Sequence, residues 1–326
     1  MGLFKQKKDI GLILCGGGAL GAYEMGAWKA IREAGLEKRI TGVSGTSIGA
    51  CNTAIFLNGD LGKGMKIWEE VVQKDLTYPN GKAIQEKLKG KLDGALGDIV
   101  QDLKDPLRIS FKEKKPKEKA PKTEGRPTLA DHLGKAALWF YNNLDMPVFS
   151  QEGIERIIDE KIPLDCKNIS KMDVFSTVTV LGDKVEPLYV SWKDKSPEEI
   201  KNIILTSAAI PVAFNERTID GKMCVDGGLV DNKPIKPLYD LGYRKFIVVN
   251  LDNIESPIFK REMMDVLRNY SGCQFIHIIP KEEFDDSPKA RFIVNKELTM
   301  ERMEMGYKDA KEALEQALGG NSVNRF

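Results

Sequence analysis

The stretches that decide the fold are residues 9–18, which read DIGLILCGGG, and residues 40–50, which read ITGVSGTSIGA. Each begins with an apolar run and passes into a glycine-rich turn, as buried strands that lead into a tight turn do. Residues 19–34 and 47–58 have helical composition, and each segment is followed by a glycine. Strand, helix, strand and helix in this order form a βαβ unit. We therefore predict a three-layer α/β/α fold with a mostly parallel central sheet.

The rest of the chain is expected to add strands and helices to the same domain, which we assign to residues 1–326. A helix over 196–209 begins with Ser196 as cap and Pro197 at the first position. A C-terminal strand and helical extension is expected over 255–326. The other predicted elements are hairpins at 173–181 with 185–192 and at 217–225, helices at 61–75, 150–161, 234–242 and 286–317, and strands at 245–250 and 274–279.

The composition disfavours several classes of protein. The 326 residues include 49 Lys and Arg and 48 Asp and Glu, a net charge of +1, which gives no reason to expect nucleic acid as a partner. Five cysteines without C-x-x-C spacing indicate neither a disulfide framework nor a zinc site. We expect no metal and no cofactor. The polar amino-terminal residues lack the apolar run of a signal peptide, which predicts a cytoplasmic protein.

Residues 76–150 form an expected insertion, and its first part, residues 76–127, is rich in Lys, Gly and Pro. Within it, residues 112–126 hold seven basic and three acidic residues, and without them the chain has 42 basic and 45 acidic residues. This segment is expected to be mobile. The aromatic helix predicted at 128–144 follows it, so we expect a lid or a peripheral membrane contact through 112–145. The alternative is a solvated charged loop and an ordinary packed helix.

The pattern Gly45-x-Ser47-x-Gly49 lies between a predicted strand and a predicted helix. A nucleophile on such a sharp turn needs neighbours without Cβ atoms two residues to either side. The helix N-terminus behind Ser47 supplies N–H groups and the positive end of a dipole, which stabilise developing negative charge. We interpret Ser47 as a nucleophile. The alternative is a buried serine that caps the helix.

A serine nucleophile needs a base, and the chain has two histidines, His132 and His277. His277 lies in the middle of an apolar run, which favours a core or edge position. His132 lies beside the segment expected to be mobile, where a rigid base would be poorly held. A Ser-His-Asp triad is therefore weakly supported.

A carboxylate that acts directly on the serine is the other possibility, and Asp226 is the candidate. It ends a β-like segment and precedes Gly227 and Gly228. Glycines allow close backbone approach and unusual dihedral angles. The same Asp-Gly-Gly sequence, taken alone, is more often found in a turn.

The run Gly16-Gly17-Gly18-Ala19-Leu20-Gly21 matches G-x-G-x-x-G after a strand and at the start of a helix. That is the context of a dinucleotide fingerprint. The fingerprint also needs an acidic residue at the end of the second strand, and residues 43–47 contain none. Three consecutive glycines can instead form an oxyanion hole, with backbone N–H groups directed at a tetrahedral intermediate.

Together these features resemble the patatin-like phospholipase family, in order and in separation along the chain. The resemblance implies that Ser47 is the nucleophile, that Asp226 is its partner in a Ser-Asp dyad, and that the triple-glycine backbone is the oxyanion hole. The family's dyad uses no histidine. The motifs that carry the resemblance are Gly16–Gly18, Gly45–Gly49, Ser207-x-x-x-Pro211, Asp226–Gly228 and the run from 207 to 235.

One position departs from the family pattern. The family commonly has Arg or Lys two residues after the triple glycine, and this chain has Leu20. We expect this change to affect rate and substrate choice rather than the type of reaction, because the backbone donors remain. The resemblance covers neither residues 76–150 nor about the last 70.

The resemblance implies a serine acyl hydrolase that cleaves ester bonds of lipids through an acyl-enzyme, in the manner of a phospholipase A, lipid acyl hydrolase or esterase. The partner is then a lipid or ester substrate. Two alternatives stay open. One is a non-catalytic patatin-like lipid-binding module, and the other is an oxidoreductase that binds a dinucleotide at Gly16–Gly21.

Overall fold

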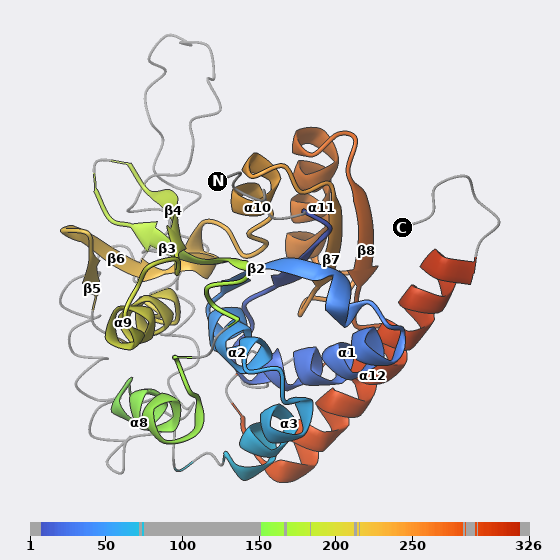
Figure 1. The fold of residues 1–326 in the computed structure, drawn as a ribbon, viewed down its shortest axis with the longest axis horizontal. Coiled ribbons are helices and arrows are strands. Elements are labelled where there is room, and N and C mark those ends of the chain that lie inside the picture. Colours follow the sequence, from blue (N-terminus) through green and yellow to red (C-terminus); the bar gives the residue numbers. More distant parts are fainter. Residues whose placement is uncertain are drawn as a thin grey trace, which may run out of the picture.

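The structure is a computed structural model with a central sheet between two layers of helices (Figure 1). The insertion expected at 76–150, with its basic segment, the helix at 128–144 and His132, lies outside the described residues. The residues that the structure describes are 8–71, 74, 151–165, 168–182, 184–211, 214, 216–282, 284, 291 and 293–319.

The described residues form an eight-stranded sheet with the order β5-β6-β3-β2-β1-β7-β8, and β4 also pairs with β3. Pairing is parallel from β3 through β2, β1 and β7 to β8, and antiparallel among β3, β4, β5 and β6. The predicted mostly parallel sheet is confirmed. The strands are β1 (Ile10–Leu14), β2 (Ile40–Thr46), β3 (Asp173–Val180), β4 (Glu186–Ser191), β5 (Arg217–Ile219), β6 (Lys222–Asp226), β7 (Lys245–Val249) and β8 (Gln274–Ile278).

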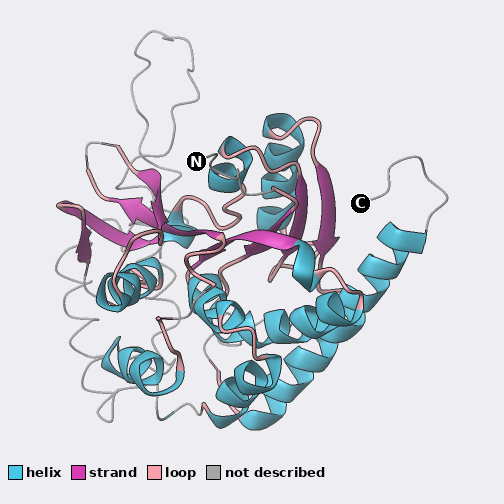
Figure 2. Ribbon diagram, viewed as in Figure 1, coloured by secondary structure: helices cyan, strands magenta, loops and turns pink. Residues whose placement is uncertain are grey.

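Helices cover both faces of the sheet, so the fold is a three-layer α/β/α arrangement (Figure 2). Helices α1, α2, α3, α8, α9 and α12 lie on one side, and α10 and α11 lie on the other (Figure 1). Their bounds are α1 (Ala22–Glu33), α2 (Ile48–Leu57), α3 (Leu61–Glu70), α8 (Gln151–Lys161), α9 (Pro197–Ser207), α10 (Lys236–Asp240), α11 (Pro257–Asn269) and α12 (Lys296–Gly319), with short 3₁₀ turns at Gly18–Gly21, Glu37–Arg39 and Gly227–Leu229.

Strand β1 shows how one apolar run supplies both cores. Ile10, Leu12 and Leu14 belong to the larger buried cluster, whereas Ile13 belongs to the smaller cluster with Phe246. Successive side chains of a strand point to opposite faces, so an unbroken apolar run is needed where helices cover both. Full burial of each such side chain contributes about 1.5–3 kcal/mol.

Helices α1 and α12 cross within the larger helical layer, and their backbones are in direct contact at the crossing. A Cβ at Gly26 would lie 1.8 Å from the Met303 carbonyl oxygen, and a Cβ at Gly306 would lie 2.0 Å from the Tyr23 carbonyl oxygen. Only glycine permits this approach. The last described helix is thereby fastened to the first.

Helix α12 begins later than the sequence indicated. Part of the predicted helix at 286–317 lies outside the described residues, and of the part that the structure describes, residues 293–295 are not helical and α12 begins at Lys296. The Asn295 side chain accepts a hydrogen bond from the Leu298 N–H at 2.9 Å, which makes Asn295 a cap for the first turn. Helix α11 was not predicted, although Ser256-Pro257 is the same start signal as Ser196-Pro197.

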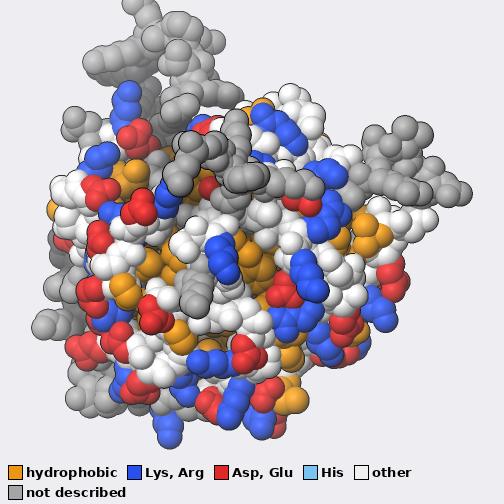
Figure 3. Space-filling model, in the orientation of Figure 1, with side chains coloured by type: hydrophobic (Ala, Val, Ile, Leu, Met, Phe, Trp, Pro, Cys, Tyr) orange, Lys and Arg blue, Asp and Glu red, His pale blue; other side chains and the backbone are white. Residues whose placement is uncertain are grey.

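Side chains of both charges are interspersed over the described part of the face in Figure 3, with apolar side chains between them. This mixture fits the near-neutral net charge of the whole chain. Within the ranges given above, no helix combines the length and the apolar character that a membrane crossing requires.

Candidate active site

Ser47 lies in the sharp turn between β2 and α2, as predicted. Its backbone has φ 55° and ψ −122°, a conformation that L-residues rarely adopt. The two flanking glycines are required by contact. A Cβ at Gly45 would lie 2.3 Å from the Gly49 carbonyl oxygen, and a Cβ at Gly49 would lie 2.2 Å from the Leu14 carbonyl oxygen. Helix α2 therefore packs directly on the ends of β1 and β2.

The serine and the aspartate meet in space. The Ser47 hydroxyl donates a hydrogen bond to Asp226 Oδ2 at 2.8 Å, although the two residues are far apart in the chain. Strand β3 brings them together, because β4 pairs along one edge of it, whereas β2 and β6 pair with successive stretches of its other edge, at residues 173–177 and 178–180. The ends of β2 and β6 therefore lie beside each other, and each carries one member of the pair.

Asp226 is held by its own turn. Its Oδ1 accepts a hydrogen bond from the Gly228 N–H at 2.7 Å, which leaves Oδ2 for Ser47. A Cβ at Gly227 would lie 2.3 Å from the Thr177 carbonyl oxygen, so this glycine is also required. The Thr179 hydroxyl donates to the Asp226 carbonyl oxygen at 2.8 Å. The carboxylate orientation is thus set by β3 and by the turn that follows β6.

Burial dominates the electrostatics of this pair. It raises the pKa of Asp226 from 3.8 to about 6, while the hydrogen bonds from the Gly228 N–H and from Ser47 lower it. Desolvation disfavours the charged carboxylate, whereas hydrogen bonds donated to it favour the charge. A carboxylate with this pKa is ionised at neutral pH and is a stronger base than an exposed aspartate.

The backbone N–H of Ser47 is also engaged. It donates to the Ser207 hydroxyl oxygen at 2.9 Å, and that hydroxyl donates to the Thr177 carbonyl oxygen at 2.7 Å. Ser207 is the last residue of α9, so this chain of bonds ties the nucleophile turn to α9 and β3. The serine of the Ser-x-x-x-Pro block, noted in the sequence only as part of a resemblance, therefore supports Ser47.

The triple glycine lies against the serine. A Cβ at Gly16 would lie 3.0 Å from the Ser47 Cβ and 2.5 Å from Asn232 Oδ1. Asn232 holds both polar groups of Gly16, since Oδ1 accepts from the Gly16 N–H at 2.9 Å and Nδ2 donates to the Gly16 carbonyl oxygen at 3.1 Å. The predicted donors therefore divide into a Gly16 N–H that is bound to Asn232 and the N–H groups of Gly17 and Gly18 that follow it.

Gly17 and Gly18 are confined by segments distant in the sequence. A Cβ at Gly17 would lie 2.7 Å from Leu251 Cδ1. Gly18 has φ +59°, and a Cβ there would lie 2.3 Å from the Arg291 carbonyl oxygen. Leu20, where the family resemblance implied a cation, is buried in the larger core. The only cationic side chain that lines the adjoining cavity, among the described residues, is that of Arg291.

An apolar cavity of about 120 Å³ adjoins Ser47 and Gly18. The described part of its lining combines apolar side chains from α2, α3, α8 and the segment after α9, including Ile48, Ile55, Trp68, Ile157, Ile158 and Phe214. Such a lining suits a hydrocarbon chain, whose burial is favourable in proportion to its apolar area. Ser47 therefore lies at the wall of a cavity that fits an apolar group.

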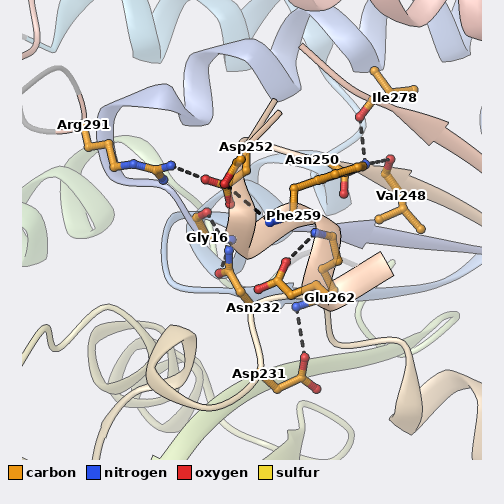
Figure 4. A network of polar contacts seen from close by, with 12 residues as sticks. Gly16, Asp231, Asn232, Val248, Asn250, Asp252, Phe259, Glu262, Ile278 and Arg291 are labelled. Carbon is orange, nitrogen blue, oxygen red and sulfur yellow. Dashed lines mark hydrogen bonds and ion pairs between the residues drawn. The ribbon is translucent and has the colours of Figure 1, made fainter. Parts of the chain in front are cut away.

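A polar network lies behind the triple glycine (Figure 4). Next to Asn232, Asp231 accepts hydrogen bonds from the Tyr189 hydroxyl at 2.6 Å and from the Lys233 N–H at 3.0 Å. The buried Lys233 ammonium forms an ion pair with Glu262. These contacts fix the loop that positions Asn232. The stretch 231–234 was part of the resemblance, but no sequence signal assigned it a task.

Of the two histidines, the structure describes His277, and it makes no hydrogen bond to Ser47. Ser47 bonds to Asp226 and Ser207, while His277 lies on the edge strand β8 and stacks on Phe275. Burial lowers the pKa of His277 to about 4, with a smaller contribution from Lys233, so its imidazole is neutral at pH 7. The expected core or edge position fits β8. Within the described residues, no group of three or more His, Cys, Asp or Glu side chains could hold a metal ion.

Similar solved structures include VipD from Legionella pneumophila, with 18% identity, a TM-score of 0.46 and coverage of 95% of this chain and 67% of that chain. For the type III effector ExoU, known from Pseudomonas aeruginosa, the identity is 17% and the TM-score is 0.42, with coverage of 95% of this chain and 53% of that chain. For human GIVD cytosolic phospholipase A2, the identity is 11% and the TM-score is 0.44, with coverage of 95% of this chain and 62% of that chain.

The chain spans between about half and two thirds of the lengths of these structures. A comparison with curated proteins finds no match. A family model described as patatin-like phospholipase matches residues 12–239, which include the triple glycine, the serine turn and Asp226. This match covers well over half of the residues, and the chain therefore belongs to the patatin-like phospholipase family.

Proposed function

We propose that this protein is a serine acyl hydrolase that cleaves ester bonds of lipids through a Ser47–Asp226 dyad. The observation that carries the proposal is the 2.8 Å hydrogen bond from the Ser47 hydroxyl to Asp226 Oδ2, made on a strained turn at the wall of an apolar cavity. Strained backbone and a carboxylate of raised pKa together are typical of reactive sites. The family membership supports the same type of reaction.

In the proposed reaction, Asp226 takes the proton of the Ser47 hydroxyl while the oxygen attacks the ester carbonyl carbon. The carbonyl electron pair moves to oxygen, and the resulting oxyanion accepts hydrogen bonds from the N–H groups of Gly17 and Gly18. Collapse of this intermediate breaks the ester C–O bond, and the protonated Asp226 gives its proton to the departing alcohol. The acyl group is left on Ser47.

Water completes the cycle by the same route. Asp226 takes a proton from water, the hydroxide attacks the acyl carbon, and the second intermediate collapses to free acid while Asp226 returns its proton to the departing Ser47 oxygen. The hydrocarbon chain of the acyl group occupies the apolar cavity in this arrangement. Gly16 does not donate to the oxyanion in this proposal, because its N–H is bound to Asn232. Its task is to hold the following two N–H groups in place.

The test uses the full chain and 1-oleoylglycerol or a phospholipid as substrate. Ser47→Ala is expected to lower kcat by at least about 10⁴-fold, and Asp226→Asn by about 10³- to 10⁴-fold, as removal of nucleophile and orienting or basic groups does in serine hydrolases. A fluorophosphonate probe is expected to label Ser47 in the wild-type chain, which peptide mass spectrometry detects.

Ser44→Ala is the matched control, since Ser44 is a buried serine of β2, the strand that precedes Ser47, and its hydroxyl makes no hydrogen bond with the described residues. It is expected to keep wild-type activity and labelling. Full activity of Ser47→Ala would disprove the dyad. A wild-type chain that hydrolyses no ester and takes no label, with or without lipid vesicles, would favour the non-catalytic lipid-binding alternative.

A further inference from the structure

The apolar cavity beside Ser47 carries one charged side chain in the part of its lining that the structure describes, the guanidinium of Arg291. Its side chain is 35% exposed, so it lies at the rim of the cavity rather than at its floor. A cation at the rim of an apolar site suits a ligand that combines a hydrocarbon chain with an anionic group.

Several contacts place Arg291 beside the triple glycine. Its carbonyl oxygen lies 2.3 Å from where a Gly18 Cβ would be, and its Nη1 lies 3.4 Å from where a Gly17 Cβ would be. The backbone and the guanidinium therefore both approach the proposed oxyanion donors. The close fit at Gly18 leaves no room for a side chain between the two segments.

A second arginine fastens the two segments to each other. Arg302, buried in α12, donates from Nη1 to the Ala19 carbonyl oxygen at 3.2 Å and to the Ile293 carbonyl oxygen at 2.9 Å. Ala19 follows the triple glycine, and Ile293 follows Arg291 by two residues. The position of Arg291 relative to the glycines is thus determined by a buried contact.

Asp252 orients the guanidinium. Arg291 Nη2 forms an ion pair with Asp252 Oδ1, and the Asp252 side chain is 9% exposed (Figure 4). An arginine has five N–H donors in a fixed fork, so a bond to one carboxylate oxygen leaves donors for a second anion. The pair therefore presents a guanidinium of fixed direction next to Gly17 and Gly18.

The arrangement of the site decides which part of a lipid meets this cation. With the acyl chain in the cavity and the ester carbonyl carbon at Ser47, the alcohol side of the ester points to the rim. The acyl carboxyl group is the group under attack, so it does not supply a separate anion. In a glycerophospholipid, the anion on the alcohol side of the ester is a phosphate.

We propose that Arg291 binds the phosphate of a glycerophospholipid substrate, beside the ester that Ser47 attacks. This rests on the proposed hydrolase function. Arg291 is then a specificity-determining residue: it favours phosphate-bearing esters over neutral ones and contributes little to hydrolysis of a neutral ester.

The experiment compares two substrates that differ only in the phosphate, 1-oleoylglycerol and 1-oleoylglycerol 3-phosphate. Arg291→Gln is expected to lower kcat/KM for the phosphate-bearing substrate by about tenfold, the size of a partly exposed charge-assisted hydrogen bond, and to leave the neutral substrate unchanged. Gln keeps an amide donor for Asp252. Arg291→Lys keeps the charge without the fork of N–H donors, so its kcat/KM for the phosphate-bearing substrate is expected to lie between those of the wild-type chain and Arg291→Gln.

Arg39→Gln is the matched control. Arg39 has a side chain 34% exposed, is also paired with an aspartate, Asp9, and precedes β2, whereas Ser47 follows it, so the two lie at opposite ends of the strand. Arg39→Gln is expected to leave kcat/KM unchanged for both substrates. An equal loss on both substrates in Arg291→Gln would assign Arg291 to the oxyanion or to the fold, and no loss on either would also overturn the proposal.

A binding measurement separates this proposal from the hydrolase function. In the Ser47→Ala background, calorimetric binding of 1-oleoylglycerol 3-phosphate is expected to weaken about tenfold on Arg291→Gln. This readout stands even if the wild-type chain hydrolyses neither substrate, an outcome that would refute the hydrolase function alone. Inorganic phosphate tests whether the site binds the free anion rather than the lipid phosphate. Inhibition by it at the concentration of the lipid would reassign the site to free phosphate.

Discussion

Two glycine turns meet at Ser47, and they are held in opposite ways. The serine turn, residues 45–49, is held by backbone that lies next to it in the βαβ unit, with Gly45 against Gly49 and Gly49 against Leu14. The first glycine turn, residues 16–18, is held by side chains and segments from much later in the chain. Asn232, Leu251 and Arg291 are the groups that confine it.

The contacts that shape the serine turn come largely from the amino-terminal βαβ unit, whereas those that shape the first glycine turn come from distant parts of the chain. The close backbone contacts of the serine turn are made by β1, β2 and α2, and the hydrogen bond from the Ser47 N–H to Ser207 adds a tie to α9. The first glycine turn also needs contacts from the loop after β6, from the residues that follow β7 and from the segment before α12. We therefore expect damage to the serine turn to affect stability and activity together, and damage around the first glycine turn to affect mainly activity.

Gly49→Ala is expected to have the largest effect. The new Cβ would lie 2.2 Å from the Leu14 carbonyl oxygen, so α2 must move away from β1. We expect a loss of about 3 kcal/mol in the free energy of unfolding, as overpacking against rigid backbone causes, and a fall of more than about 100-fold in kcat. Denaturant unfolding and hydrolysis of 1-oleoylglycerol measure both.

Gly62→Ala is the control for this change, because each glycine is the second residue of its helix. A Cβ at Gly62 would meet only Asp60 Oδ1, at 3.5 Å, an ordinary contact. Alanine is favoured over glycine in a helix, so stability is expected to stay equal or rise slightly. If Gly49→Ala were as stable and active as Gly62→Ala, the described contact between α2 and β1 would not be what constrains the turn.

Asn232→Ala is expected to have an intermediate effect, confined to activity. It removes both hydrogen bonds to Gly16 and frees the glycine turn, so the N–H groups of Gly17 and Gly18 lose their fixed direction. We expect kcat to fall by about 10- to 100-fold, the cost of a misplacement of about 1 Å. The melting temperature should change much less than in Gly49→Ala.

Asn202→Ala is the matched control, since Asn202 also bonds through both ends of its amide, to the Thr218 carbonyl oxygen and to Arg217, away from the cavity. It is expected to keep wild-type kcat. A similar loss of kcat in both variants would mean that general loosening, rather than the hold on Gly16, explains the effect.

The smallest difference is expected in the pH profile of kcat/KM. For the wild-type chain, activity should fall about tenfold per pH unit below the Asp226 pKa of about 6, because the protonated carboxyl cannot accept the Ser47 proton. Asn232→Ala should lower the whole curve and leave its acid limb in place. An acid limb that moves in this variant would show that the two turns share one electrostatic environment.

The sequence predicted the parts of the site that rest on local pattern. The strand-turn-helix context of Ser47 and the glycines two residues to either side follow from the backbone geometry that a sharp turn demands. Asp226 was found because a serine without a usable histidine needs another base, and the family resemblance pointed to the same residue. The parallel sheet followed from the βαβ order.

Asn232 and Arg291 could not be predicted in the same way. An asparagine that bonds to a backbone glycine has no periodicity, and an isolated arginine beyond the last predicted strand carries no motif. Their roles depend on where β6, β7 and α12 bring the chain back, which is a property of the assembled sheet. The start of α12 was missed for a more local reason, because a single capping residue, Asn295, marks it, whereas the Ser256-Pro257 signal of α11 was present in the sequence and was overlooked.

The buried carboxylate of Asp226 also sets a relation between activity and resistance to unfolding. Between the ordinary pKa of 3.8 and the folded-state pKa of about 6, the folded chain holds the proton more tightly than the unfolded chain does. The contribution of this group to stability is therefore full below that window and is lost as pH rises through it. The ionised form that can act as a base is thus the form that folding disfavours. Under the proposed mechanism, the protein is therefore most reactive in the pH range where this one group makes it least stable.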